Sequence, residues 1–196
     1  MRPSLILSLA TALALLATPE PVSAQRRGGT TAFGLQGGAT LTGFTDAVQG
    51  TDMRWGGTVG VFGSFRPSYY VETNLEVNWV QKGVDRIGID YIDVPLTVGG
   101  VGPLAGGASV RAYAGIGIGF KVGCRSEITA VCDNAKSTEW TLPFGVMFGK
   151  TTTSGKSFGI DVRYALGLGD AFENSDVNNR AWLFRVFIAT GAGGSR

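Results

Sequence analysis

Two acidic residues that could carry chemistry share one face of a predicted strand. Glu72 and Glu76 stand four positions apart in the alternating segment YYVETNLEVNWVQK at 69–82. A carboxylate pair could serve glycoside hydrolysis, which uses separations of about 5 to 9.5 Å. Four residues of strand separate the two carboxylates by about 13 Å, since each residue adds about 3.3 Å. This pair is therefore too widely spaced for that reaction.

Other candidate catalytic or nucleotide-binding motifs are excluded by their residue types or by their positions in the chain. The chain contains no histidine, which excludes Ser–His and Cys–His nucleophile pairs and zinc sites built on imidazole. Two segments resemble nucleotide loops, GIGIG at 115–119 and GKTTTSGKS at 149–157. The first lies inside a predicted strand, and a strand follows the second where a phosphate loop needs a helix. We therefore predict no catalytic residue, no cofactor, no metal site and no enzymatic activity.

Eight segments alternate between bulky apolar residues and small or polar ones, which is the period of a β-strand. The opposite parity of Ile87 and Ile89 predicts a bulge near Asp90, and Pro95 is unfavourable within a strand because it lacks a ladder donor. The predicted strands cover 32–41, 54–66, 69–82, 88–100, 110–122, 138–149, 158–168 and 180–190. Longer connections at 42–53, 83–87, 123–137 and 169–179 alternate with shorter ones at 67–68, 101–107 and 150–156.

Eight strands whose connections alternate between longer and shorter predict an all-β protein, an eight-stranded antiparallel up-and-down transmembrane β-barrel. The faces that carry charges are rich in glycine and other small residues, which suits the narrow interior of a small barrel. The opposite faces are bulky and apolar, which suits lipid. The tryptophans fit an aromatic girdle beside the longer loops, although a soluble core is the competing interpretation; they are Trp55, Trp79, Trp140 and Trp182.

Charges that face the interior must be paired, because an isolated buried charge is very costly. The predicted interior set contains four acids and four bases, so full pairing is feasible, and we expect the two glutamates to pair with bases of this set. The predicted lumen network consists of Glu72, Glu76, Asp93, Arg111, Lys121, Asp161, Arg163 and Arg185.

Residues 1–24 have the form of a signal peptide, with Arg2 before an apolar run at 5–17 and small residues at the expected cleavage site. An N-terminal membrane anchor is the alternative, but the run is short for a spanning helix. The remaining domain is 25–196. In an exported chain Cys124 and Cys132 are expected to form a disulfide, with two free thiols as the alternative. Scattered charges, 17 basic and 15 acidic, give no indication of nucleic-acid binding.

The stretch LEVNWVQKG at 75–83, followed by YIDVPLTVG at 91–99, resembles the outer-membrane β-barrel domain family that includes PorT-like proteins. The resemblance implies an outer membrane protein of a Gram-negative envelope and carries over no catalytic residue. Unlike many such barrels, the chain lacks a terminal aromatic residue, since Phe187 is followed by IATGAGGSR. The matching positions, structural only, are Glu76, Gln81, Lys82, Gly83, Tyr91, Asp93 and Pro95.

These patterns together predict a monomeric outer membrane barrel with a side-chain-filled lumen. Both termini are expected to be periplasmic, and the longer loops, including that of Cys124 and Cys132, are expected to face outside. The predicted role is structural, adhesive or binding through the extracellular loops, or support of an envelope machine, with lipid and an extracellular or envelope protein as partners. The alternative is a periplasmic or secreted lipocalin-like barrel that binds a small apolar ligand.

Overall fold

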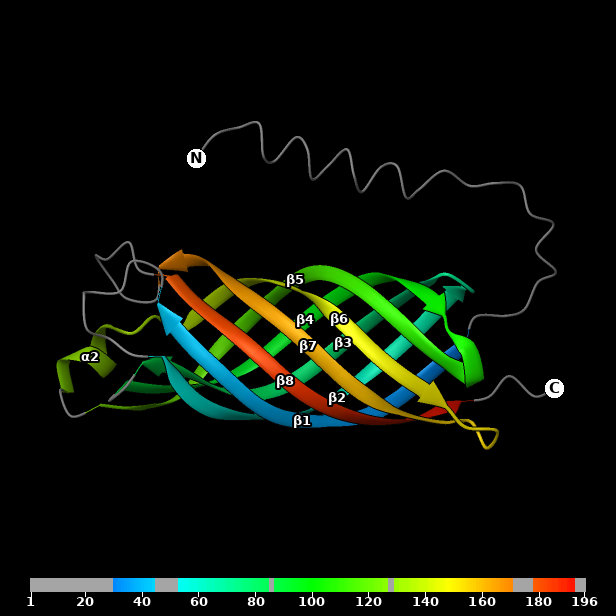
Figure 1. The fold of residues 1–196 in the computed structure, drawn as a ribbon. Coiled ribbons are helices and arrows are strands. Elements are labelled where there is room, and N and C mark those ends of the chain that lie inside the picture. The colour runs from blue at the N-terminus through cyan, green and yellow to red at the C-terminus, as the bar shows by residue number, and fades with distance from the viewer. Residues whose placement is uncertain (1–29, 45–52, 85–86, 127–128, 171–177, 193–196) are drawn as a thin grey trace.

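A computed structural model describes residues 30–44, 53–84, 87–126, 129–170 and 178–192, so the predicted signal peptide lies outside the described residues. Within these ranges eight antiparallel strands close into a barrel in which each strand pairs with its sequence neighbours and β1 pairs with β8 (Figure 1). The predicted fold class is therefore confirmed. The strands are β1 (Thr30–Phe44), β2 (Arg54–Ser68), β3 (Val71–Val84), β4 (Ile87–Pro103), β5 (Ala108–Arg125), β6 (Thr138–Thr151), β7 (Lys156–Asp170) and β8 (Asn178–Ala192).

The barrel has two unlike ends. Helix α2 (Thr129–Asn134) lies beyond the ends of the odd-numbered strands, and we call this the loop end. At the opposite end, the turn end, β1 begins, β8 ends, and residues 69–70, η1 (Ala105–Gly107) and residues 152–155 connect the strands (Figure 1). The connection between β3 and β4 spans only 85–86, because both strands extend further than predicted. The loop expected at 83–87 is thus shorter than the alternation suggested.

The first turn is displaced from its predicted position. Pro67 and Ser68 were expected to form it, but β2 runs to Ser68 and the turn lies at 69–70. The pairing of β2 with β3 shifts register between Phe65 and Ser68. Since proline has no N–H to donate, it fits an irregular stretch of the ladder better than a regular one. Pro67 therefore marks a bulge before the turn.

Two other prolines lie inside strands and leave matching gaps in the hydrogen-bonded ladder. The register of β3 with β4 skips the rungs at Val94 and Pro95, and the register of β5 with β6 skips two rungs beside Pro143. Each gap has a direct cause, because proline lacks the donor that the ladder needs. The predicted bulge is also present, as a register shift between Asp90 and Tyr91.

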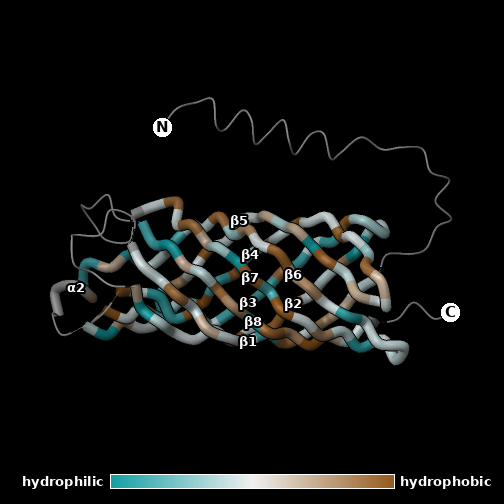
Figure 2. Tube along the Cα trace, viewed as in Figure 1, coloured by the Kyte–Doolittle hydropathy of each residue, from teal (hydrophilic) through white to brown (hydrophobic). Residues whose placement is uncertain are grey.

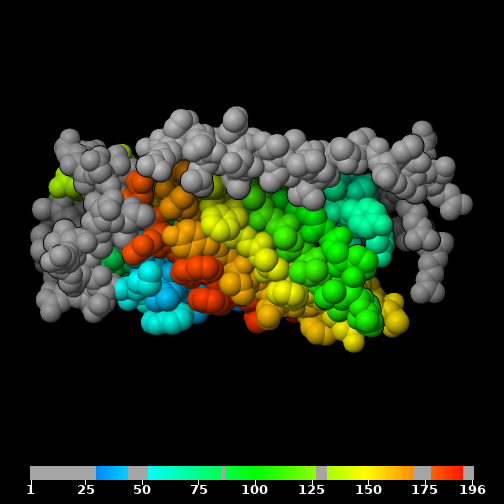
Figure 3. Space-filling model, turned by 45° about the horizontal axis from the view of Figure 1, so that its top comes forward, coloured from blue at the N-terminus to red at the C-terminus, as the bar shows by residue number. Residues whose placement is uncertain are grey.

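The outer wall is apolar and the inner wall is mainly polar, which is the reverse of a soluble barrel. Figure 2 shows apolar and polar residues alternating along each strand, and in Figure 3 the side chains of β5 to β8 form diagonal bands without an opening in the part of the wall in view. So large an exposed apolar surface is incompatible with a water-facing wall. Outward residues of the middle of the barrel include Leu35, Val61, Leu75, Leu96, Ile116, Ile160 and Val186.

Gly60 of β2 shows why the inner wall needs small residues. A Cβ atom added there would overlap the Oδ1 atom of Asn78 and the carbonyl oxygen of Val77, whereas at Gly63, on the outer face of the same strand, only the ring of Phe33 comes near, at 3.3 Å. We expect Gly60→Ala to lower the free energy of unfolding by about 1–3 kcal/mol, the usual cost of overpacking. Gly63→Ala, the matched control, should change it by less than about 0.5 kcal/mol.

Urea unfolding of the refolded barrel, followed by tryptophan fluorescence, measures both effects. Equal losses for the two variants would contradict the assignment of Gly60 to a crowded interior.

Candidate functional site

Charged side chains fill the lumen in three groups, and β3 contributes one residue to each. Glu72, Glu76 and Lys82 follow one another along this strand from the turn end to the loop end, all on its inner face. The turn-end group is Arg66, Glu72 and Arg111; the central group is Glu76, Asp161, Arg163 and Arg185; the loop-end group is Lys82, Asp93 and Glu139.

The central group is a charge-balanced cluster of two carboxylates and two guanidinium groups. Arg163 of β7 binds Glu76 through two nitrogens, with Nη2 2.5 Å from Oε1 and Nη1 3.0 Å from Oε2. Arg185 of β8 donates from Nη1 to the same Glu76, at 3.0 Å, and from Nε to Asp161, at 2.9 Å. All four residues are at most 2% exposed. Bidentate charge-assisted bonds of this kind are strong and directional.

Neutral side chains donate further hydrogen bonds to the carboxylates of the central group. Gln36 of β1 donates to Glu76 at 2.7 Å, and Asn78 does so at 3.0 Å. The hydroxyl of Tyr113, from β5, donates to Asp161 at 2.5 Å and accepts from Nε of Arg163 at 2.8 Å. Strands β3 and β7 are four apart in an eight-stranded barrel, so the pair formed by their side chains crosses the whole lumen. The interior is therefore filled by side chains at this level.

The loop-end group contains one predicted residue, Asp93, and two that were not predicted, Lys82 and Glu139. The Nζ atom of Lys82 lies 3.0 Å from Asp93 and 2.9 Å from Glu139, and it also lies over the ring of Tyr91, 5.0 Å from its centroid. Neither Lys82 nor Glu139 was in the predicted network, although both have the inward parity of their strands. They were left out of the predicted lumen network because they stand at the edges of the predicted strands.

The turn-end group joins one acid to two bases. Glu72 accepts hydrogen bonds from Nε and Nη2 of Arg66, at 3.0 and 2.5 Å. Nε of Arg111 lies 3.7 Å from the same carboxylate, and its Nη2 donates to the hydroxyl of Thr97 at 3.1 Å. Arg66 was not predicted, because it stands at the last position of the expected second strand.

Lys121 differs from the other predicted lumen residues. Its Nζ donates to the carbonyl oxygens of Cys132 and Ala135, at 3.1 and 2.5 Å, and not to a carboxylate. The Cys124–Cys132 disulfide joins the same segment to β5, so the predicted bridge is confirmed. Ala135 packs in turn against Ile89, which is fully buried. Two polar links and one covalent link thus hold the α2 segment against the loop end.

The structure therefore separates the eight predicted lumen residues into four positions. Glu76, Asp161, Arg163 and Arg185 form the central group; Glu72 and Arg111 belong to the turn-end group; Asp93 belongs to the loop-end group; Lys121 contacts the α2 segment. Among the described residues, no three His, Cys, Asp or Glu side chains are placed to hold a metal ion, and no helix is long and apolar enough to cross a membrane.

Tryptophans stand on the outer wall towards the loop end. Trp55, Trp140 and Trp182 are exposed, whereas Trp79 is half-buried. Trp182 packs edge-on against Tyr164, with ring centroids 4.9 Å apart. Tryptophan and tyrosine rings are typical of the level where the apolar part of a membrane meets its headgroups.

Comparison with known proteins places the barrel in a family. Residues 8–187 match the family described as "Outer membrane protein beta-barrel domain", and no curated protein matches the chain. Neisserial surface protein A (NspA) has a similar structure at 11% identity, covering 81% of this chain and 97% of that chain, with a TM-score of 0.57.

The outer membrane protein OprG from Pseudomonas aeruginosa is also similar, at 13% identity, covering 82% of this chain and 95% of that chain, with a TM-score of 0.51. At such identities the likeness concerns the fold alone. The family match confirms the resemblance seen in the two strand motifs, without distinguishing PorT-like proteins within it. The chain belongs to the outer membrane protein β-barrel domain family and is a β-barrel of the outer membrane.

Proposed function

We propose that this protein is a non-conducting outer membrane barrel that acts through its loop end as a binding or adhesive surface. The observation that carries the proposal is the contact between Glu76 and Arg163 across the lumen, at 2.5 Å. Arg185 joins them from β8 at 3.0 Å. Side chains paired in this way leave no free path at mid-height, which disfavours diffusion of solutes through the barrel.

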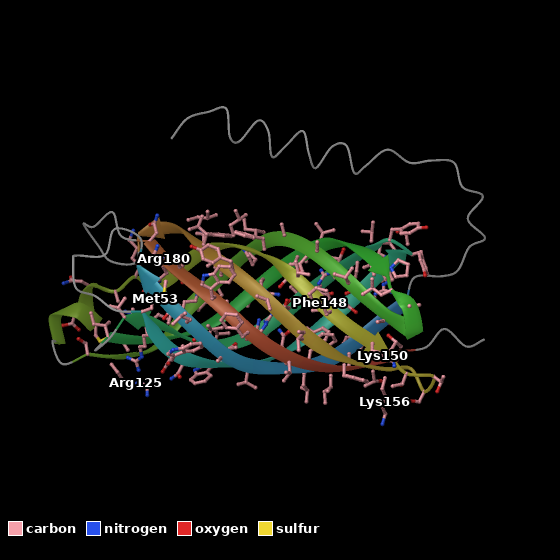
Figure 4. The ribbon with its side chains drawn as sticks, in the orientation of Figure 1. Met53, Arg125, Phe148, Lys150, Lys156 and Arg180 are labelled. Atoms are coloured by element: carbon pink, nitrogen blue, oxygen red, sulfur yellow. A yellow bond between two sulfur atoms is a disulfide. The ribbon has the colours of Figure 1, made fainter. Side chains whose placement is uncertain are left out.

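The construction of the loop end supports the same proposal. The disulfide and Lys121 fix the segment that carries α2, and Arg125 and Asp90 form an ion pair beside it at 2.8 Å. The side chain of Arg125 is 62% exposed and lies at the loop end in Figure 4. A segment that is already ordered loses less conformational entropy on binding. In the proposed orientation this end faces outside and both termini are periplasmic.

A lipocalin-like function has little support from the interior. Binding of a wholly apolar ligand along the barrel axis would need a continuous apolar inner wall, but charged groups occupy three successive levels of this lumen.

Conductance in a planar bilayer tests the closed lumen. We expect the purified barrel to give no stable single-channel steps, because the central group fills the cross-section. The double variant Glu76→Ser/Arg163→Ser keeps the charge balance while removing the side chains that meet, and it should conduct measurably. Heat-modifiable gel migration verifies that each sample is folded. A large stable pore in the unmodified protein would contradict the proposal.

Surface proteolysis tests the orientation and the role of the disulfide. Trypsin added to intact cells should cut slowly after Arg125 or Lys136, which flank α2. It should cut there faster in the double variant Cys124→Ser/Cys132→Ser, because the segment is then held only by non-covalent contacts. The barrel itself should remain heat-modifiable in both proteins. Cleavage only after the outer membrane is permeabilised would place this segment in the periplasm and overturn the proposed orientation.

A further inference from the structure

The turn end of the lumen contains a cavity of about 290 Å³ that the proposed function does not use. Its rim includes Thr31 at the start of β1 and Gly191 at the end of β8, so the cavity opens towards the turn end. Its apolar wall includes Phe62, Met147 and Phe187, which form one buried cluster. The rings of Phe62 and Phe187 meet edge-on, with centroids 6.1 Å apart.

The other wall of the cavity carries an unbalanced positive charge. Arg66 and Arg111 share the single carboxylate of Glu72, whereas the central group has as many acids as bases. Glu72 is the only acidic residue among those that line the cavity in the described part of the chain. Arg111 is 3% exposed, and its Nε has no hydrogen-bond partner among the described residues. Lys150, which is exposed, also lines the cavity. The lining therefore has three cations and one acid, and the two arginines alone have one positive charge more than Glu72 can match.

We propose that this cavity is a binding site for a short-chain monocarboxylate, with the carboxylate held by Arg66 and Arg111 and the alkyl chain against Phe62, Met147 and Phe187. A single carboxylate matches the excess charge of the two arginines, while Lys150 is exposed to water. Guanidinium groups bind carboxylates with matched geometry. A small inorganic anion would leave the apolar wall exposed to water, while a neutral alkane would leave the charge unmatched. The two walls together thus select an amphiphile.

The volume of the cavity sets the size of the ligand. About 290 Å³ lies near the lower limit of the volumes of small-molecule sites. A site of this size suits a short acid such as hexanoate. Because the central group closes the lumen beyond the cavity, the ligand enters and leaves by the turn end, and the site retains the acid without passing it through the barrel.

Two methionines provide a reporter and its control. Met147 is part of the cavity wall, and Met53 lies at the opposite, loop end of the barrel (Figure 4). The full barrel, labelled with methyl-¹³C methionine and refolded in micelles, is titrated with hexanoate. We expect a saturable shift of the Met147 methyl resonance and no shift of Met53. Hexanol, which has the same chain without the charge, should bind Met147 more weakly.

Variants distinguish hexanoate that binds in the cavity from hexanoate that partitions into the micelle. Arg66→Gln removes one cation and should weaken hexanoate binding by about tenfold or more, the loss expected for a hydrogen bond to a charged group. Arg125→Gln makes the same change at the loop end and should leave the affinity unchanged. Ala189→Leu fills the cavity and should abolish the Met147 response.

Three results would overturn the proposal. They are a Met147 shift that does not saturate, equal shifts at Met53 and Met147, and hexanoate affinity that is unchanged in both Arg66→Gln and Ala189→Leu. Heat-modifiable migration of each variant confirms that the compared samples are folded.

Discussion

Glu76→Gln is expected to lower the free energy of unfolding by about 3–5 kcal/mol, the cost of breaking a buried ion pair by removing one partner. The substitution keeps the shape of the side chain but removes the charge that faces both Arg163 and Arg185. Arg163 and Arg185 are each 2% exposed, and Asp161 alone would remain to balance them. Water cannot replace the lost carboxylate at this depth, so the full cost of an unmatched buried cation falls on the folded state.

Urea unfolding in detergent micelles measures the loss, and Glu72→Gln is the matched control. The side chain of Glu72 is 11% exposed, and that of its partner Arg66 is 36% exposed, so water can solvate part of what is uncovered. We expect a smaller loss at this position. Equal losses at the two glutamates would mean that the central group is no better shielded from water than the turn end.

A double variant tests whether the central group acts as a unit. Glu76→Gln/Arg163→Gln leaves the Arg185–Asp161 pair in a neutral cluster, so it should be more stable than the sum of the two single losses implies. Residues that share one network normally show such non-additivity. Strict additivity would instead indicate that each charge is solvated independently, by water that enters the lumen.

The fold could be predicted from the sequence because its main signal is local. In β5, Ile116 and Ile118 point outward while Gly117 and Gly119 point inward, and this period of two persists along the strand whatever its neighbours are. The first turn was predicted at 67–68 but lies at 69–70, because Pro67 is a common turn residue that also fits a bulge. Helix α2 was not predicted, because its six residues are too few to display a helical period.

The pairing of individual charges could not be predicted in the same way. Arg163 is 87 positions from Glu76 in the sequence, and their contact depends on the register and stagger of the strands between them. Alternation specifies which face a side chain occupies but not its height along the axis. Lys121 has inward parity, yet it lies near the loop end, where the carbonyl oxygens of the α2 segment are its nearest acceptors.

The height of a residue along the barrel axis also determines how much a charge on the outer wall lowers the free energy of unfolding. Ile116→Arg is expected to lower the free energy of unfolding in lipid vesicles by about 2–4 kcal/mol, the cost of an arginine at the midplane of a bilayer. Ile116 lies in the middle of β5 and is 50% exposed. Val122→Arg, on the same face of the same strand but near the loop end, should cost about 0–1 kcal/mol.

The two positions share a strand, a face and a similar exposure, with Val122 at 59%, so the difference between them isolates depth in the membrane. If the outer wall met water, an arginine would be harmless at both positions. A greater loss for Val122→Arg would place the midplane towards the loop end and would separate the tryptophans there from the membrane interface. A loss confined to Ile116→Arg would centre the apolar band of the outer wall near the middle of β5, the strand whose Tyr113 hydrogen-bonds to the central group. Lipid would then surround the barrel at the height where its lumen is closed.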